Sequence, residues 1–119
     1  MNSNKYKYIN LSYLNEVADG NKDLIIELIE IFKSQIPEFN DLFNSYFASS
    51  NWYQIGLVAH KAKSSVAVIG MSKLADDLKI LETLSKNSEK IDTYQAYIDN
   101  FNESTKHAVS ELDDYISKI

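Results

Sequence analysis

A histidine and a lysine one helical turn apart are the residues of this sequence best suited to chemistry. His60 is one of only two histidines, and Lys63 follows it within the segment VAHKAKSSVAVIG, residues 58–70. A histidine side chain has an ordinary pKa of about 6.5, so much of it is neutral and nucleophilic at cellular pH. The ammonium group of Lys63 could pair with an anion at His60, and Lys61 adds longer-range positive potential. These residue types favour reversible capture of a phosphoryl group.

The helical period predicts that His60 points away from the protein core. At about 100° per residue, the opposite half of the helix carries mostly apolar residues: Ile55, Val58, Ala62, Ser65, Val66 and Ile69. We expect the face around His60 to form a docking surface for another protein, and a substitution of Gly56 by Trp to block docking without affecting the fold. The predicted docking residues are Gly56, Leu57, Lys61, Ser64, Ala67 and Met71.

Four long helices and one short helix must position these residues. The chain of 119 residues contains three Gly and one Pro, which is little material for the tight turns of a many-stranded sheet. Apolar spacing predicts a short helix over 11–18 and long helices over 22–48, 52–69, 72–86 and about 91–118, with a kink at Pro37. The predicted fold is all-α: one domain, residues 1–119, forming an antiparallel four-helix bundle with a short extra N-terminal helix.

The last of these helices carries the longest apolar stripe. Its residues alternate in spacings of four and three, which is typical of a bundle seam. The stripe consists of Tyr94, Ile98, Phe101, Thr105, Ala108, Leu112, Tyr115 and Ile119.

Charge and composition exclude several partners. The net charge is −5, and all twelve basic residues are Lys. An acidic chain without Arg argues against nucleic acid and against anionic membrane surfaces as partners. The absence of Cys excludes disulfides and thiolate metal sites. No signal peptide or membrane span is recognisable, so we expect a cytoplasmic protein. Met1 at the start favours a stand-alone protein, although a segment of a larger hybrid kinase would look the same.

Two further patterns bear on catalytic or metal sites. Glu103 and His107 lie four apart in the last helix, but carboxylate–histidine metal sites in bundles need Glu-x-x-His motifs from two helices. We therefore expect a surface ion pair there and no metal site. The three glycines are too scattered to build a phosphate loop, which argues against ATP-dependent kinase activity. We expect no cofactor of the protein's own.

The segment AHKAKSSVAVIGMSKLADDLKILE, residues 59–82, resembles the signature of histidine-containing phosphotransfer (HPt) domains. That signature reads Ala-His-x-Leu-Lys-Gly-Ser/Ala, then a Gly after the helix, then a Leu-rich helix that ends in Leu-Glu. The resemblance covers about 13–86, and the last helix at about 91–118 fits as well. Ala62 departs from the usual Leu, and Ser64 departs from the frequent Gly. The matching residues are Ala59, His60, Lys63, Ser65, Gly70, Leu74, Leu81 and Glu82, preceded by Phe32, Pro37 and Glu38.

The resemblance implies a role in a two-component phosphorelay. His60 would accept a phosphoryl group on Nε2 from the aspartyl phosphate of a receiver domain and pass it to the aspartate of a second receiver. Lys63 would stabilise the phosphate, and Mg²⁺ would be supplied by the partner. The implied partners are receiver domains of response regulators and of hybrid sensor histidine kinases. The chain would be a monomeric phosphocarrier and no autonomous enzyme.

Two other classes of function stay open at this stage. The first is a helical interaction module that binds receiver or kinase partners and whose His60 is never phosphorylated. The second is an enzyme that uses His60 as a general base, which would need a cleft and a carboxylate to orient the ring. Neither of these two features is recognisable in the sequence.

Overall fold

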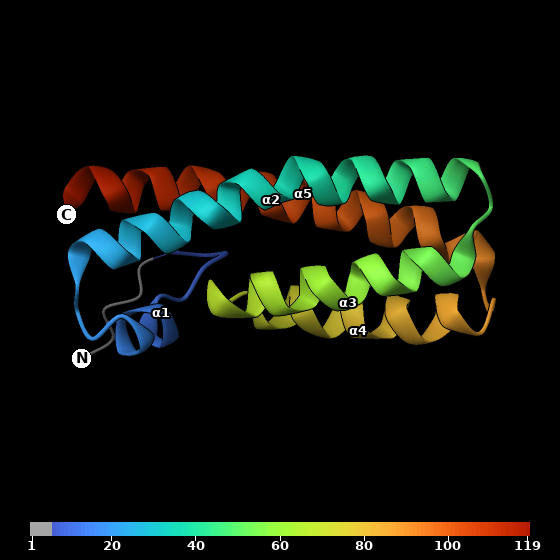
Figure 1. Cartoon of the computed structure of the whole chain (residues 1–119), viewed down its shortest axis with the longest axis horizontal. Coiled ribbons are helices and arrows are strands. Elements are labelled where there is room, and N and C mark those ends of the chain that lie inside the picture. Colours follow the sequence, from blue (N-terminus) through green and yellow to red (C-terminus); the bar gives the residue numbers. More distant parts are fainter. Residues whose placement is uncertain (1–5) are drawn as a thin grey trace.

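The computed structural model describes residues 6–119, and their regular structure is entirely helical (Figure 1). It confirms the predicted all-α class and the helical bundle. Residues 1–5 of the predicted domain lie outside the described residues. The elements in chain order are α1 (Ser12–Val17), α2 (Lys22–Ala48), α3 (Trp52–Val68), α4 (Ser72–Lys86), the 3₁₀ turn η1 (Ile91–Thr93) and α5 (Tyr94–Lys118).

Each long helix packs against two neighbours, so the four helices enclose one core. α2 contacts α3 and α5, and α4 contacts the same two helices from the other side. The predicted stripe of α5 faces this core, since Tyr94, Ile98, Phe101, Ala108 and Leu112 are fully buried. The apolar residues are confined to stripes on amphipathic helices. Among the described residues, no helix is long and apolar enough to cross a membrane.

Helix α2 runs through Pro37 without a break. Proline has no backbone N–H and its ring crowds the preceding turn, so an interior proline bends a helix. Figure 1 shows the axis of α2 changing direction between its N-terminal and C-terminal halves, as the predicted kink requires. Helix continuity persists because Phe32 and Phe39, on either side of Pro37, are both buried against the core.

The segment Lys7 to Asn10, which we call the strap, fixes the turn between α3 and α4. The Glu111 carboxylate of α5 accepts hydrogen bonds from the backbone N–H groups of Lys7, Tyr8 and Ile9 at 2.9, 2.8 and 3.2 Å. Further along the strap, the Asn10 N–H donates to the Ile69 carbonyl at 3.0 Å. Gly70 has φ of +83°, and a Cβ there would collide with the Asn10 backbone. The turn that sets α4 beside α3 therefore requires glycine.

Candidate functional site

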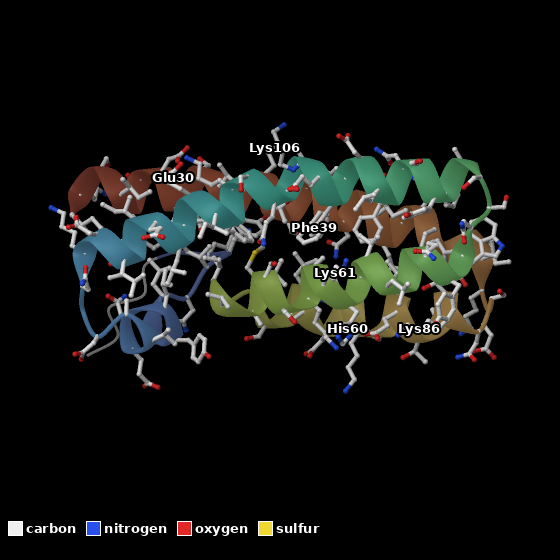
Figure 2. All side chains as sticks on the ribbon, viewed as in Figure 1. Glu30, Phe39, His60, Lys61, Lys86 and Lys106 are labelled. Carbon is white, nitrogen blue, oxygen red and sulfur yellow. The ribbon has the colours of Figure 1, made fainter. Side chains whose placement is uncertain are left out.

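His60 lies in the middle of α3 on its outer surface. The imidazole is 58% exposed, whereas Ala59, Ala62 and Val66 of the same helix are buried in the core. Figure 2 shows His60 on the side of α3 that faces away from α2, with Lys86 further along the same side of the bundle. The outward orientation that the helical period predicted is therefore confirmed.

A carboxylate from α4 meets the imidazole. Glu82 Oε2 lies 3.1 Å from His60 Nδ1, and the same oxygen accepts a hydrogen bond from Lys86 Nζ at 2.9 Å. The other oxygen, Oε1, accepts from Lys63 Nζ at 3.4 Å. The Glu82 side chain is only 15% exposed, so these contacts are largely shielded from water. We call His60, Lys63, Glu82 and Lys86 the His60 cluster.

Glu82 stays ionised because its three partners favour the charged form. Burial raises the pKa of Glu82, but hydrogen bonds from Lys86, His60 and Lys63 outweigh burial and lower the pKa to about 2. At any cellular pH the His60 cluster therefore contains a carboxylate held between two ammonium groups.

The charge of Glu82 determines which nitrogen of His60 carries the proton. An ionised carboxylate only accepts hydrogen bonds, so the neutral imidazole is assigned the tautomer with hydrogen on Nδ1. The lone pair is then on Nε2. Among the described residues, no hydrogen-bond partner is found for Nε2. In the neutral form of the ring, the cluster thus presents Nε2 to the solvent as an outward-facing nucleophile.

The low pKa of Glu82 predicts a pH-dependent contribution to stability. Its folded-state value of about 2 lies below its ordinary value of 4.5, so the contribution is complete above about pH 4.5 and is lost as the pH falls toward 2. Glu82→Gln removes the charge with little change in shape. We expect it to lower the free energy of unfolding by about 1 kcal/mol at pH 6 and by almost nothing near pH 2.

Urea unfolding of both proteins at the two pH values measures this difference. Glu103→Gln serves as the control, because Glu103 forms only an exposed pair with His107. An equal loss of stability by Glu82→Gln at pH 6 and pH 2 would contradict the assigned role of the Glu82 charge.

An open hollow lies beside His60 between α2 and α3. Its volume is about 500 Å³, and it adjoins a second hollow of about 260 Å³ with which it shares Gln35, Ser64 and Ser65. Leu42 and Ile31 are exposed at 40% and 46% along these hollows, which gives them an apolar wall. We call the two together the α2–α3 groove. It is lined by Gln35, Glu38, Phe39, Leu42, His60, Lys61, Ser64 and Ser65 near the imidazole, and by Leu28, Ile31, Phe32, Val68 and Ile69 further away.

Two of the predicted docking residues do not lie on an open surface. Gly56 is buried against α4, where an added Cβ would lie 2.7 Å from Lys86 Cγ and 2.9 Å from Ser85 Oγ. Met71 is only 4% exposed. Both placements on the docking face were wrong. The helical period of α3 takes no account of α4, which covers Gly56, and Met71 lies beyond the end of α3, in the turn before α4. Gly56→Trp would disrupt the packing of α3 on α4 and is not a test of docking.

The remaining docking candidates are accessible. Lys61, Ser64 and Ala67 are exposed and Leu57 is half-buried. Lys61 and Ser64 line the α2–α3 groove together with residues of α2 that the sequence did not indicate, such as Phe39 and Leu42. The exposed part of the predicted docking surface therefore lies toward α2 and not toward α4.

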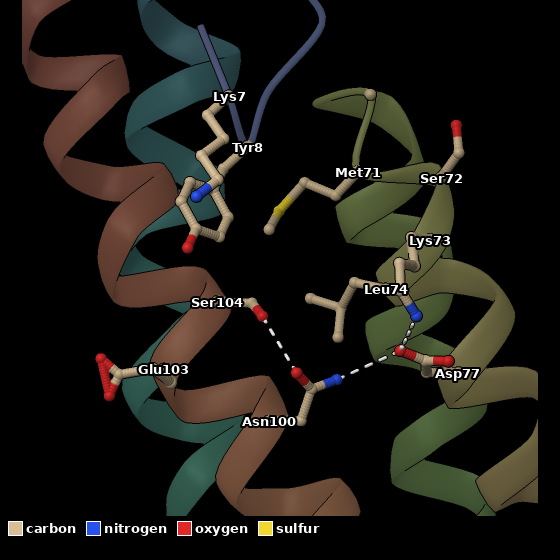
Figure 3. A pocket seen from close by; sticks show the side chains of 11 residues that line it. Lys7, Tyr8, Met71, Ser72, Lys73, Leu74, Asp77, Asn100, Glu103 and Ser104 are labelled. Carbon is tan, nitrogen blue, oxygen red and sulfur yellow. Dashed lines mark hydrogen bonds and ion pairs between the residues drawn. The ribbon is translucent and has the colours of Figure 1, made fainter.

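Another hollow lies elsewhere, between the strap, α4 and α5 (Figure 3). It measures about 570 Å³, and four of its polar side chains form one network. Asn100 donates to Asp77 at 3.2 Å and accepts from Ser104 at 3.3 Å, while Lys73 lies 3.6 Å from Asp77. Among the residues that the structure describes, no histidine lines this hollow.

His107 forms the surface pair that was expected of it. Its Nε2 lies 3.3 Å from Glu103, and its ring stacks on Tyr8 with centroids 4.7 Å apart. Over residues 6–119, no three His, Asp or Glu side chains gather as a potential metal site. His60 thus remains the histidine with an unengaged Nε2 on an open surface.

Comparisons with known proteins give no match to any family model, to any curated protein or to any solved structure.

Proposed function

We propose that this protein is a phosphorelay intermediate of the HPt type that carries a phosphoryl group on His60. The observation that supports it most strongly is the arrangement of the His60 cluster. Nδ1 is held by the Glu82 carboxylate at 3.1 Å, Nε2 faces outward, and Lys63 and Lys86 lie on the same carboxylate. Such a site has a nucleophile and positive charge but lacks the enclosed cleft of an autonomous enzyme.

The transfer step follows from the tautomer. The Nε2 lone pair attacks the phosphorus of an aspartyl phosphate on the partner, the new N–P bond forms, and the P–O bond to the aspartate breaks. The aspartate leaves as a carboxylate with the bonding electron pair. Because Nδ1 keeps its proton, the phosphorylated ring is cationic, and Glu82 offsets this charge. In the next transfer the ring leaves as neutral imidazole, which makes it a good leaving group.

Positioning and charge account for most of phosphoryl-transfer catalysis. Lys63 is the group that we propose to stabilise the phosphoryl oxygens, since its ammonium lies on α3 one turn after His60 and contacts Glu82 at 3.4 Å, the longest contact of the cluster. A small movement would bring it to a phosphoryl group on Nε2. Mg²⁺ would come from the partner receiver domain, as the resemblance implies.

The α2–α3 groove is the proposed docking surface for the receiver domain. Apolar side chains at the edge of a polar site are typical of transient protein interfaces. Leu42 and Phe39 of the groove lie beside His60, so a partner seated there would have its phosphoaspartate within reach of Nε2. The partners would be receivers of response regulators and hybrid sensor histidine kinases, met by a monomer in the cytoplasm.

The alternative functions are supported less well. Glu82 does provide the orienting carboxylate that a general base would need, and the sequence did not indicate it in that role. However, the imidazole is 58% exposed, and a general base works on a substrate held in a shielded cleft. A module with a silent histidine would not need the partly buried Glu82 carboxylate that orients Nδ1. Phosphoryl carriage uses every member of the cluster.

A panel of phosphorylated, Mg²⁺-loaded receiver domains tests the proposal. We expect at least one receiver to transfer its phosphoryl group to this protein, giving a mass increase that is lost in acid and kept in alkali, as a phosphorus–nitrogen bond requires. No transfer from any receiver to the folded, helical protein would favour the silent interaction module.

A further inference from the structure

We propose that Lys86 is a positioning residue that keeps Glu82 on His60, and that Gly56 exists to give the Lys86 side chain its path. This inference rests on the proposed function of His60 and concerns a residue that the sequence did not indicate. The two oxygens of Glu82 are shared unequally among its partners.

Oε2 of Glu82 is contacted by both His60 and Lys86. Lys86 Nζ lies 2.9 Å from this oxygen and His60 Nδ1 lies 3.1 Å from it, whereas Lys63 uses Oε1 at 3.4 Å. The two lysines are therefore not equivalent. Lys86 makes the shorter contact, on the oxygen that orients the imidazole.

The Lys86 side chain reaches Glu82 by crossing α3 at Gly56. An added Cβ on Gly56 would lie 2.7 Å from Lys86 Cγ, which is closer than side chains tolerate. Ser85, next to Lys86, is fully buried, and its hydroxyl donates to the Leu81 carbonyl at 2.7 Å. A small buried serine and a glycine thus let α3 and α4 approach closely one turn before His60. The close approach confines the aliphatic part of Lys86 between the helices.

The two lysines are therefore expected to act differently after phosphorylation. Once a phosphoryl group is on Nε2, its oxygens attract Lys63 away from Glu82. Lys86 stays on Oε2, so Glu82 keeps both a positive partner and its contact with Nδ1. Without Lys86, a phosphorylated site would leave Glu82 with the ring as its only partner, and the carboxylate would be free to turn into the solvent.

The position of Glu82 also determines which nitrogen of the neutral ring carries hydrogen. A carboxylate on Nδ1 favours the tautomer with hydrogen there and leaves the lone pair on Nε2. When the carboxylate turns away from Nδ1, hydrogen can reside on Nε2, and a protonated Nε2 is not a nucleophile.

NMR of the ¹⁵N-labelled His60 ring in Lys86→Met tests the inference without any partner protein. Met keeps the aliphatic part of the side chain and removes the charge. For the neutral ring, we expect the ratio of the tautomer with hydrogen on Nδ1 to the tautomer with hydrogen on Nε2 to fall about threefold relative to the wild type. Lys86→Arg should restore the wild-type ratio, because Arg can still donate to Oε2 across Gly56.

Gly56→Ala provides a second, independent variant. Its Cβ displaces the Lys86 side chain, so the tautomer ratio should match that of Lys86→Met, and the melting temperature reports any loss of packing. A wild-type tautomer ratio in Lys86→Met would overturn the inference. The NMR measurement needs no receiver domain, so it decides the role of Lys86 separately from the proposed function. If the tautomer ratio falls as expected but no receiver transfers its phosphoryl group to the wild type, the proposed function alone fails.

Discussion

His60→Gln is expected to abolish phosphoryl transfer while the bundle stays folded. The imidazole is 58% exposed, and its one hydrogen bond in the described residues is to Glu82, so its loss removes little packing. A glutamine amide can still meet the Glu82 carboxylate but has no nucleophilic nitrogen. We expect a fall in the transfer rate of about 10³-fold or more, with unchanged helicity by circular dichroism.

His107→Gln is the matched control, because it replaces the other histidine of the chain. His107 stacks on Tyr8 and pairs with Glu103 outside the His60 cluster. This variant should take up phosphate as the wild type does. Labelling that persists in His60→Gln and disappears in His107→Gln would mean that the wrong histidine has been chosen.

A bulky residue in place of Ser64 is expected to lower the rate of transfer from receiver domains about 100-fold, while His60 keeps its nucleophilic nitrogen. Ser64 is exposed one turn after His60 and lines both parts of the α2–α3 groove. In Ser64→Trp the indole fills the space where a partner would sit. Phosphoramidate, a small phosphoryl donor, needs no docking surface and should still label His60. The two donors together separate loss of docking from loss of chemistry.

Ser110→Trp controls for the effect of adding an exposed tryptophan elsewhere, because Ser110 is exposed on α5 and does not line the groove. It should leave both reactions unchanged. Wild-type rates from receiver domains in Ser64→Trp would place the docking surface outside the α2–α3 groove.

The helices and the outward position of His60 could be predicted because each depends on the period of one helix. The apolar stripe of α5 is one case: residues spaced by three and four must face one side, and Ile98, Phe101 and Leu112 are fully buried. Similarly, the residues opposite His60 on α3, such as Ile55 and Val66, are in the core. The fold class needs no more than this periodicity and the short links between the helices.

Contacts between helices could not be predicted in the same way. Gly56 lies within about 60° of His60 on the helical projection, yet α4 covers it. A projection of one helix does not include the neighbour that packs on it. The Glu82 contact joins positions 22 apart in the chain, and only the register of α4 on α3 brings them together. Small residues at Gly56 and Ser85 are the one sequence signal for that close packing.

The most direct test of the central claim is ³¹P and ¹⁵N NMR of this protein after transfer from a phosphorylated receiver domain. The structure leaves Nε2 open and commits Nδ1 to Glu82. We therefore predict a single phosphorus–nitrogen coupling to Nε2 of His60, with the Nδ1 proton retained. A phosphoryl group on Nδ1, on His107 or on a carboxylate oxygen would contradict the account.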